Sequence, residues 1–170
     1  MKVFAIDPGT DKSAWVIYDS EGGQLIRAGI DQNVDLLKGL REENVESTWG
    51  VMVIEMIKSY GNVMGDSVLQ TCVWIGRFSE ACHLHRIEYI HRKAIVTQLC
   101  HNSRAKDSNV RQALIDRFSA GKGETVAIGK KGAEGPLYGV KKDMWAALAV
   151  AVAWCEIQKE SAEKLERGLR

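Results

Sequence analysis

Runs of apolar residues in the first ninety positions predict a strand-rich part of the fold. The four apolar residues Val3–Ile6 predict a strand buried on both faces, because such a run leaves no side for water. Similar segments follow: residues 14–18 and 24–30 predict strands of an antiparallel meander, 34–43 a helix and 51–57 a fourth strand. A buried strand, a helix and another buried strand imply a right-handed crossover, so we expect the fourth strand parallel to the first.

Helical spacing dominates the rest of the chain. Residues 63–85 predict a long helix, 86–91 a fifth strand, and 93–100 and 109–118 shorter helices, the second capped by Asp107 or Ser108. The glycine-rich residues 121–139 predict an irregular loop, and a long helix that opens at Asp143 changes from Ala- and Val-rich to charged, so its second half should be exposed.

The helix expected over residues 63–85 carries two apolar stripes. Met64, Val68, Cys72, Ile75 and Cys82 form one stripe, and Trp74, Phe78 and Ala81 form the other. One sheet cannot cover both stripes, so the second is expected to lie in a dimer interface or under a neighbouring helix.

Length and composition predict one domain, residues 1–170, that buries a sufficient core without disulfides. The N-terminus lacks the features of a signal peptide, and no apolar run approaches the roughly 18 residues of a membrane span. We therefore expect a cytoplasmic protein whose four cysteines are free thiols.

The charges are unevenly placed, although the net charge is only +1. Residues 92–142 carry 11 Lys or Arg against 4 Asp or Glu, whereas residues 1–91 carry 8 against 13. A protein that binds a phosphate backbone next to acidic metal ligands needs a run of basic residues such as 92–142. The distribution therefore favours a nucleic-acid partner.

Three carboxylates stand where buried elements begin or end. Asp7 closes the first strand before the Pro8-Gly9 turn, Glu55 interrupts the apolar run of the fourth strand, and Asp143 opens the last helix. If the first and fourth strands are neighbours, these acids can meet at one edge of the sheet. Crowded acids repel unless a cation lies among them, and oxygen-only ligands favour Mg²⁺ or Mn²⁺. Two such ions about 4 Å apart support phosphodiester hydrolysis.

A zinc site is an alternative, because cysteines and histidines gather in residues 82–101. They are Cys82, His83, His85, His91, Cys100 and His101. They lack the paired spacing of standard zinc ligands, so buried thiols and surface histidines are the expected interpretation.

The segments that carry the three acids resemble the RuvC-like Holliday junction resolvases, especially the compact phage-type members. They read FAIDPGT (4–10), VIEMI (53–57) and GPLYGVKKDMWAALAVAVAW (135–154), and LCHNSRAKDSNVRQALIDRF (99–118) adds a further match. The resemblance implies an α/β fold of the RNase H-like, retroviral integrase superfamily, with a five-stranded mixed sheet flanked by helices. It also implies a homodimer, through the helix 63–85, that nicks four-way DNA junctions with Mg²⁺ or Mn²⁺ in a bacterial or phage-infected cell.

The resemblance assigns roles to single residues. Asp7, Glu55 and Asp143 match the family's metal-binding acids. Many bacterial members carry a further acid three residues after the position of Asp143, where this chain has Ala146. The chain departs from the family at this position, and the departure bears on the binding of a second ion. Lys141 and Lys142 lie where an ammonium would stabilise the charge of the attacked phosphate, or they form a solvated pair at a helix start.

Basic side chains around these segments are the candidates for contact with DNA. They are Lys58, Arg92, Lys93, Arg104, Lys106, Arg111, Arg117, Lys130 and Lys131, and Tyr60 is the candidate for stacking on a base.

Two other classes of function compete with a nuclease. Actin and sugar kinases also open with a strand and Asp-x-Gly-Thr, but they need two such lobes, which 170 residues cannot supply. A non-catalytic junction-binding protein would gain nothing from three repelling acids beside DNA. The sequence therefore favours a metal-dependent endonuclease without a small-molecule cofactor.

Overall fold

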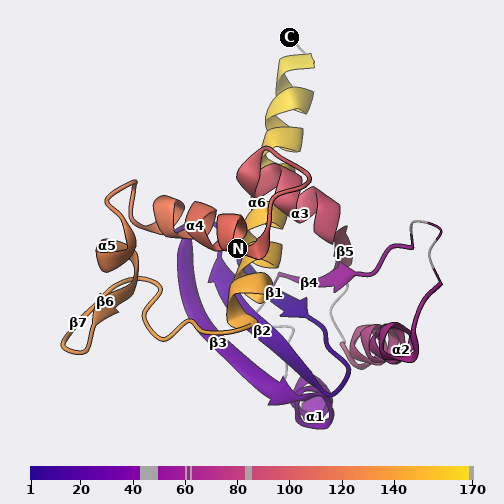
Figure 1. The fold of residues 1–170 in the computed structure, drawn as a ribbon. Helices are drawn as coiled ribbons and strands as arrows, with labels where there is room; N and C mark the ends of the chain where they lie inside the picture. Colours follow the sequence, from indigo (N-terminus) through magenta and orange to yellow (C-terminus); the bar gives the residue numbers. More distant parts are fainter. Residues whose placement is uncertain (43–49, 60, 62, 83–85, 169–170) are drawn as a thin grey trace.

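A five-stranded mixed sheet, in the order β3-β2-β1-β4-β5, forms the centre of the computed structural model, which describes residues 1–42, 50–59, 61, 63–82 and 86–168 (Figure 1). The strands are β1 (Lys2–Asp7), β2 (Lys12–Asp19), β3 (Gln24–Gln32), β4 (Val51–Met56) and β5 (Ile87–His91). The first three form an antiparallel meander, whereas β4 runs parallel to β1 and β5 parallel to β4. The predicted sheet is confirmed.

Helices cover both faces of this sheet. One face carries α1 (Asn33–Glu42) and α2 (Asp66–Ala81), and the other carries α3 (Arg92–Cys100), α4 (Asp107–Phe118) and α6 (Met144–Gly168). Residues 159–168 of α6 are exposed and project beyond the sheet, as predicted (Figure 1). Within the described residues, no helix is long and apolar enough to cross a membrane.

The apolar runs of β1 and β4 are buried on both faces because alternate side chains enter different cores. Val3, Ala5, Val51 and Val53 pack toward α6, whose Ala and Val residues allow a close approach. The intervening residues of the two strands pack with side chains from α1 and α2, namely Leu36, Leu37, Leu40, Ile75 and Phe78. The strand ends that carry Asp7 and Glu55 are therefore held between two packed layers.

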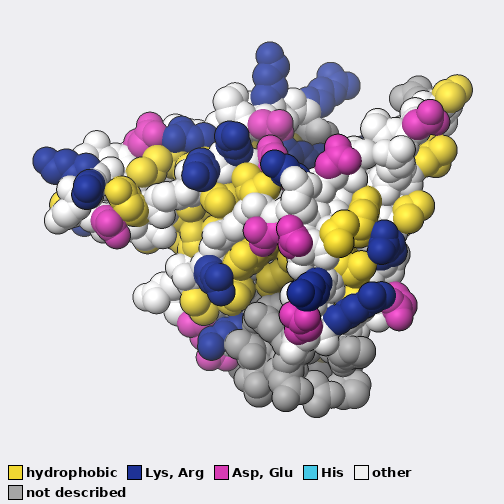
Figure 2. Space-filling model, turned by 90° about the horizontal axis from the view of Figure 1, so that it is seen from below, with side chains coloured by type: hydrophobic (Ala, Val, Ile, Leu, Met, Phe, Trp, Pro, Cys, Tyr) yellow, Lys and Arg dark blue, Asp and Glu magenta, His cyan; other side chains and the backbone are white. Residues whose placement is uncertain are grey.

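The prediction of an irregular loop over residues 121–139 is partly wrong. The segment contains α5 (Glu124–Ile128) and a short hairpin of β6 (Gly129–Lys130) and β7 (Ala133–Glu134), and it projects as an arm (Figure 1). Its base is fixed because Leu137 is fully buried and its N–H donates to the carbonyl of Ala127 (2.8 Å). Lys130 and Lys131 lie in the hairpin, toward the end of the arm where Lys and Arg side chains are visible in Figure 2.

The second apolar stripe of α2 is covered by a neighbouring helix, one of the two arrangements expected for it. Phe78 and Ala81, assigned to the second stripe, are buried with Ile75 because α2 packs against both α1 and β4. Leu69 and Val73 are instead the large apolar side chains that α2 exposes, at 51% and 61%. The helix spans Asp66–Ala81 rather than 63–85, and residues 83–85 lie outside the described part.

The start of α4 also differs from the prediction. The helix begins at Asp107, two residues early, and Lys106 is its N-cap residue in place of Asp107 or Ser108. The Lys106 N–H donates to Oδ1 of Asn109 (2.9 Å), which satisfies a backbone donor at this end. Asp107 therefore lies in the first turn, with its side chain available to other elements.

Asn33, the first residue of α1, fixes the β1–β2 turn that follows Asp7. Its Nδ2 donates to the carbonyls of Gly9 (2.9 Å) and Thr10 (3.1 Å), and its Oδ1 accepts from Ser13 Oγ (2.7 Å). Asn33 and Ser13 are each only 1% exposed. A Cβ at Gly9 would lie 2.3 Å from the backbone oxygen of Lys12, so this turn requires glycine.

Asn33→Ala is expected to lower the free energy of unfolding by about 2 to 3 kcal/mol, because it leaves a buried hydroxyl and two turn carbonyls without their partner. Urea denaturation measures the loss, with the exposed Gln32→Ala as the control. Equal stability of the two variants would show that this network does not hold the turn.

Candidate active site

The ends of β1 and β4 bring Asp7 and Glu55 together. Ala5 pairs with Val53 and Ile6 with Ile54 in the parallel register, so the next residues on the two strands are Asp7 and Glu55. Both continue the alternation toward the α6 face, and Asp143 directly precedes α6. The structure therefore places the three predicted acids around one end of the sheet.

Burial and neighbouring acids raise the pKa of Asp7 to about 7. Desolvation is the largest cause, the charges of Glu55 and Asp143 raise the pKa further, and Arg92 lowers it. Asp7 thus lies within electrostatic range of both other acids, and near neutral pH a proton and a cation would compete for it.

Glu55 is a buried acid with an unsatisfied oxygen. Burial raises its pKa, and among the described residues its Oε2 has no hydrogen-bond partner. Arg92 Nη1 lies 3.8 Å from this oxygen, too far for a hydrogen bond but close enough for an ion pair. Nη2 of the same guanidinium contacts Asp107.

The residues present fit an oxygen-preferring divalent cation. A buried carboxylate oxygen without a donor, beside a second acid whose pKa is raised, is a donor set that a cation would stabilise. Within the described ranges, no three acid, histidine or cysteine side chains are close enough to hold a metal as they stand. Closure of the ligand set would therefore require the side chains to move.

Lys141 and Lys142 are exposed immediately before Asp143, and Lys142 has a left-handed backbone. Its φ is 49°, a conformation that costs a residue with a Cβ about 1 kcal/mol relative to glycine. The strain lies beside a candidate metal ligand, where such backbone outliers concentrate.

Lys142→Gly is therefore expected to be about 1 kcal/mol more stable than Lys142→Ala, because only glycine relieves the strain. Thermal denaturation of both variants measures the difference. The same pair at Lys141 serves as the control, where Gly should be no better than Ala; a similar gain there would contradict the assignment of strain to Lys142.

Several predicted DNA contacts lie near the acids. Arg92 reaches Glu55, and Arg104 and Lys106 are exposed in the segment that leads to Asp107. Lys58 and Lys93 are exposed and line a groove of about 480 Å³ with His91, beside the ends of β4 and β5. Tyr60 lies outside the described residues.

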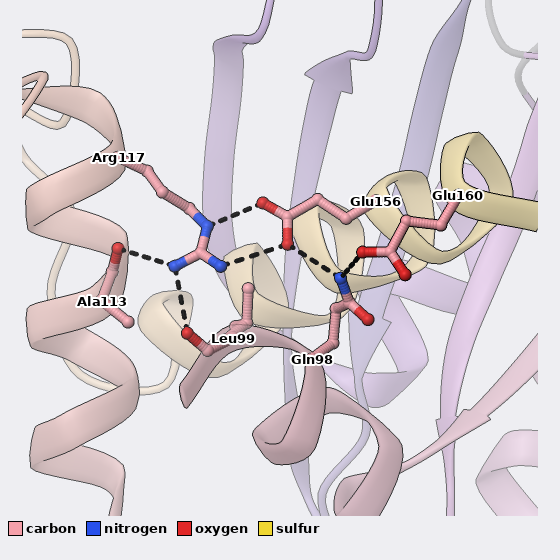
Figure 3. A network of polar contacts seen from close by, with 6 residues as sticks. All are labelled: Gln98, Leu99, Ala113, Arg117, Glu156 and Glu160. Carbon is pink, nitrogen blue, oxygen red and sulfur yellow. Dashed lines mark hydrogen bonds and ion pairs between the residues drawn. The ribbon is translucent and has the colours of Figure 1, made fainter. Parts of the chain in front are cut away.

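Two predicted contacts are held by protein groups. Arg111 forms an ion pair with Glu124 and lies over the ring of Trp145, 4.8 Å from its centre, so it joins α4, α5 and α6. Arg117 is bound in the network of Figure 3: Nε and Nη2 donate to the two carboxylate oxygens of Glu156, and Nη1 donates to the carbonyls of Leu99 and Ala113. These four hydrogen bonds engage Arg117 within the fold, which argues against the expectation that it contacts phosphate.

The histidines and cysteines weighed for zinc are only partly described, since His83 and His85 lie outside the described residues. Cys82 is buried in the core beside α1 and α2, whereas His91 Nδ1 is 3.0 Å from the carbonyl oxygen of Met56. Cys100 packs against the core on the other face of the sheet.

Comparison with known proteins finds a likeness in structure and none in sequence. No family model matches the sequence, and no curated protein matches it. The sheet order and the long C-terminal helix are those of an RNase H-like fold, and within this class the chain is similar to RuvC from Thermus thermophilus. The TM-score is 0.63 at 15% identity, covering 95% of this chain and 97% of that chain. T. thermophilus RuvC in complex with a Holliday junction substrate gives 0.63 at 11% identity, covering 94% and 96%.

Proposed function

We propose that the chain is an endonuclease that nicks Holliday junctions and other branched DNA in a bacterial or phage-infected cell, with divalent ions held by Asp7, Glu55 and Asp143. The observation that carries this proposal is the pairing of two partly buried acids at the ends of adjacent parallel strands, with a buried Glu55 oxygen unsatisfied. The RuvC fold over nearly the whole chain supports it.

The chemistry follows from the properties of the three acids. Two Mg²⁺ ions, for which Mn²⁺ can substitute, would supply an activated water and stabilise the leaving oxygen of the cleaved phosphodiester. Asp7, Glu55 and Asp143 would hold the ions, and Asp7 lies within electrostatic range of both other acids. Asp143 is exposed and can adjust its position, and water would complete the coordination where Ala146 takes the place of a further acid.

The basic residues of the chain can hold DNA on this side of the sheet. Arg104, Lys106, Lys58 and Lys93 are exposed in the segments that follow β4 and β5 or precede α4, and Lys130 and Lys131 extend the positive charge onto the arm. Lys141 and Lys142 are close enough along the chain to Asp143 to offer an ammonium to the attacked phosphate. Tyr60 remains the candidate for stacking on an unpaired base.

Symmetrical nicking of a four-way junction requires two active sites, and α2 is the proposed homodimer interface. Leu69 and Val73 are exposed on this helix. Single apolar side chains are common on protein surfaces, so the proposal depends on a second copy of the chain covering both. Figure 2 shows hydrophobic side chains on this face of the molecule. A second copy packed through α2 would bury them.

Two alternatives make different demands on the acids. A junction-binding protein without activity would not need to bury Glu55 beside Asp7, since this costs free energy without a cation. An actin-type nucleotide site needs a second lobe to close over the phosphates, whereas the described residues form one five-stranded sheet with its helices and a short hairpin. The buried acid pair therefore favours the nuclease.

The test incubates the protein with a synthetic four-way junction and with a linear duplex of matched sequence, in Mg²⁺, Mn²⁺ or EDTA. We expect nicks in the junction with either metal and none in EDTA. Junction binding without cleavage in any metal would support the non-catalytic alternative, and equal cleavage of both substrates would contradict junction specificity.

A further inference from the structure

Arg92 joins the candidate metal site to the start of α4. Its Nη1 is 3.8 Å from Glu55 Oε2, a buried oxygen without a hydrogen-bond partner among the described residues. Its Nη2 contacts Oδ1 of Asp107, whose side chain is 90% exposed. A single guanidinium thus lies between a buried acid of the site and an exposed acid outside it.

The two contacts of this guanidinium differ in strength. The Glu55 contact is an ion pair without a hydrogen bond, whereas Asp107 is in direct contact with a donor nitrogen. Asp107 is also held by its position in the first turn of α4, where the helix dipole favours a negative charge. Arg92 can therefore leave Glu55 without losing its stronger partner.

A divalent ion and Arg92 would compete for Glu55. In the absence of a metal, the guanidinium is the positive charge that compensates the buried carboxylate. A metal bound at the same oxygen would replace that compensation and repel the guanidinium. The charges of Arg92 and Asp107 also act on Glu55 in opposite directions, since Arg92 lowers its pKa and Asp107 raises it.

We propose that Arg92 is a positioning residue that stands in for the divalent ion at Glu55, and that Asp107 holds the guanidinium once the ion displaces it. The proposal rests on the metal-binding function above. Its consequence is that the pair sets the metal affinity: Arg92 lowers the affinity, and Asp107 restores part of it by drawing the guanidinium away.

The experiment measures the affinity of the protein for Mn²⁺ alone, without DNA, from the electron paramagnetic resonance signal of free Mn²⁺. At about pH 8.5, above the pKa of about 7 that burial and neighbouring acids give Asp7, competition from protons is small. Arg92→Gln is expected to bind Mn²⁺ about tenfold more tightly, because removing one positive charge near a divalent ion has about this effect. Arg92→Lys keeps the charge and should stay close to wild type.

Asp107→Asn is expected to bind Mn²⁺ about threefold more weakly, and this loss should largely disappear in the Arg92→Gln background. If the loss of affinity disappears without Arg92, Asp107 acts by holding the guanidinium. If the loss is the same without Arg92, Asp107 acts through its own charge. Arg41→Gln, which removes a surface charge paired with Glu80 on the other face of the sheet, is the control and should leave the affinity unchanged.

Melting without metal checks folding and provides a second readout. Arg92→Gln should melt at a lower temperature than wild type without metal, and saturating Mn²⁺ should raise its melting temperature more, since its buried Glu55 oxygen lacks a compensating charge.

Equal Mn²⁺ affinity of wild type and Arg92→Gln would overturn the inference. A loss of affinity in Asp107→Asn that is unchanged without Arg92 would also overturn it. If Arg92→Gln does not fold, Arg92→Met takes its place in the same comparison, and unchanged Mn²⁺ binding by the exposed Asp107→Asn overturns the inference. Absence of Mn²⁺ binding in the wild type would instead overturn the proposed function.

Discussion

Asp7→Asn is expected to abolish metal-dependent nicking and, at the same time, to make the metal-free protein more stable at pH 8 by about 2 to 4 kcal/mol. The carboxylate has a pKa of about 7 in the fold against an ordinary value of 3.8, so the folded state binds its proton more tightly than the unfolded state. The stability that protonated Asp7 contributes is therefore complete below about pH 4 and is lost as the pH rises to about 7. Asparagine has no such charge to bury.

Urea denaturation in EDTA at pH 4 and pH 8 measures this effect. The advantage of Asp7→Asn should be present at pH 8 and absent near pH 4, and saturating Mg²⁺ should stabilise the wild type more than the variant. Asp116→Asn, on the exposed side of α4, is the matched control and should show neither change. A free energy of unfolding that is lower for Asp7→Asn than for the wild type, at pH 8 without metal, would contradict the raised pKa assigned to Asp7.

Arg117→Ala should lower the free energy of unfolding by about 2 to 3 kcal/mol without weakening junction binding at equal folded fraction. The guanidinium makes a two-point contact with Glu156, at 2.7 and 3.2 Å, and binds two backbone carbonyls that join α3 and α4 (Figure 3). Its loss leaves Glu156, which is only partly exposed, with Gln98 as its remaining hydrogen-bond partner.

Arg104→Ala is the matched comparison for Arg117→Ala, because Arg104 is exposed and lies before α4 near the site. It should weaken junction binding and reduce its dependence on salt, with little change in stability. Arg117→Lys should recover little of the lost stability, because an ammonium cannot make the forked contact. A loss of DNA affinity with unchanged stability in Arg117→Ala would show that this residue contacts phosphate after all.

The sheet could be predicted from the sequence because its signals are local. The runs that include Val3–Ile6 and Val51–Ile54 are long enough to require burial on both faces, and the crossover rule then sets the strands parallel. The juxtaposition of Asp7 and Glu55 follows from that register. The end of β4 was predicted one residue late, at position 57 instead of Met56.

The contacts of individual polar residues were harder to predict because they join distant segments. Nothing local indicates that Asn33 bonds to Gly9 or that Asp107 meets Arg92. The position of Arg117 did carry a usable signal: it follows the buried Leu114 by three residues, which places it on the packed side of α4. A basic residue on the buried face of a helix is more often bound internally than free for DNA.

The sequence could not decide between the two alternatives for the second stripe of α2 for a related reason. Helical spacing shows which side chains lie together, but it does not show how many neighbours the helix has. Phe78 and Ala81 are covered because α1 lies beside α2 on the same face of the sheet, which leaves Leu69 and Val73 outside. The arm was missed because α5 and its hairpin are short and lie in a glycine-rich segment.

The most direct test of the proposed active site is a crystal grown with Mn²⁺ and measured for anomalous scattering. We expect a peak bound by both Asp7 and Glu55, about 2 Å from their carboxylate oxygens, and the loss of that peak in Asp7→Asn. Saturating Mn²⁺ that binds only elsewhere on the protein, or that leaves both carboxylates without an ion, would contradict it.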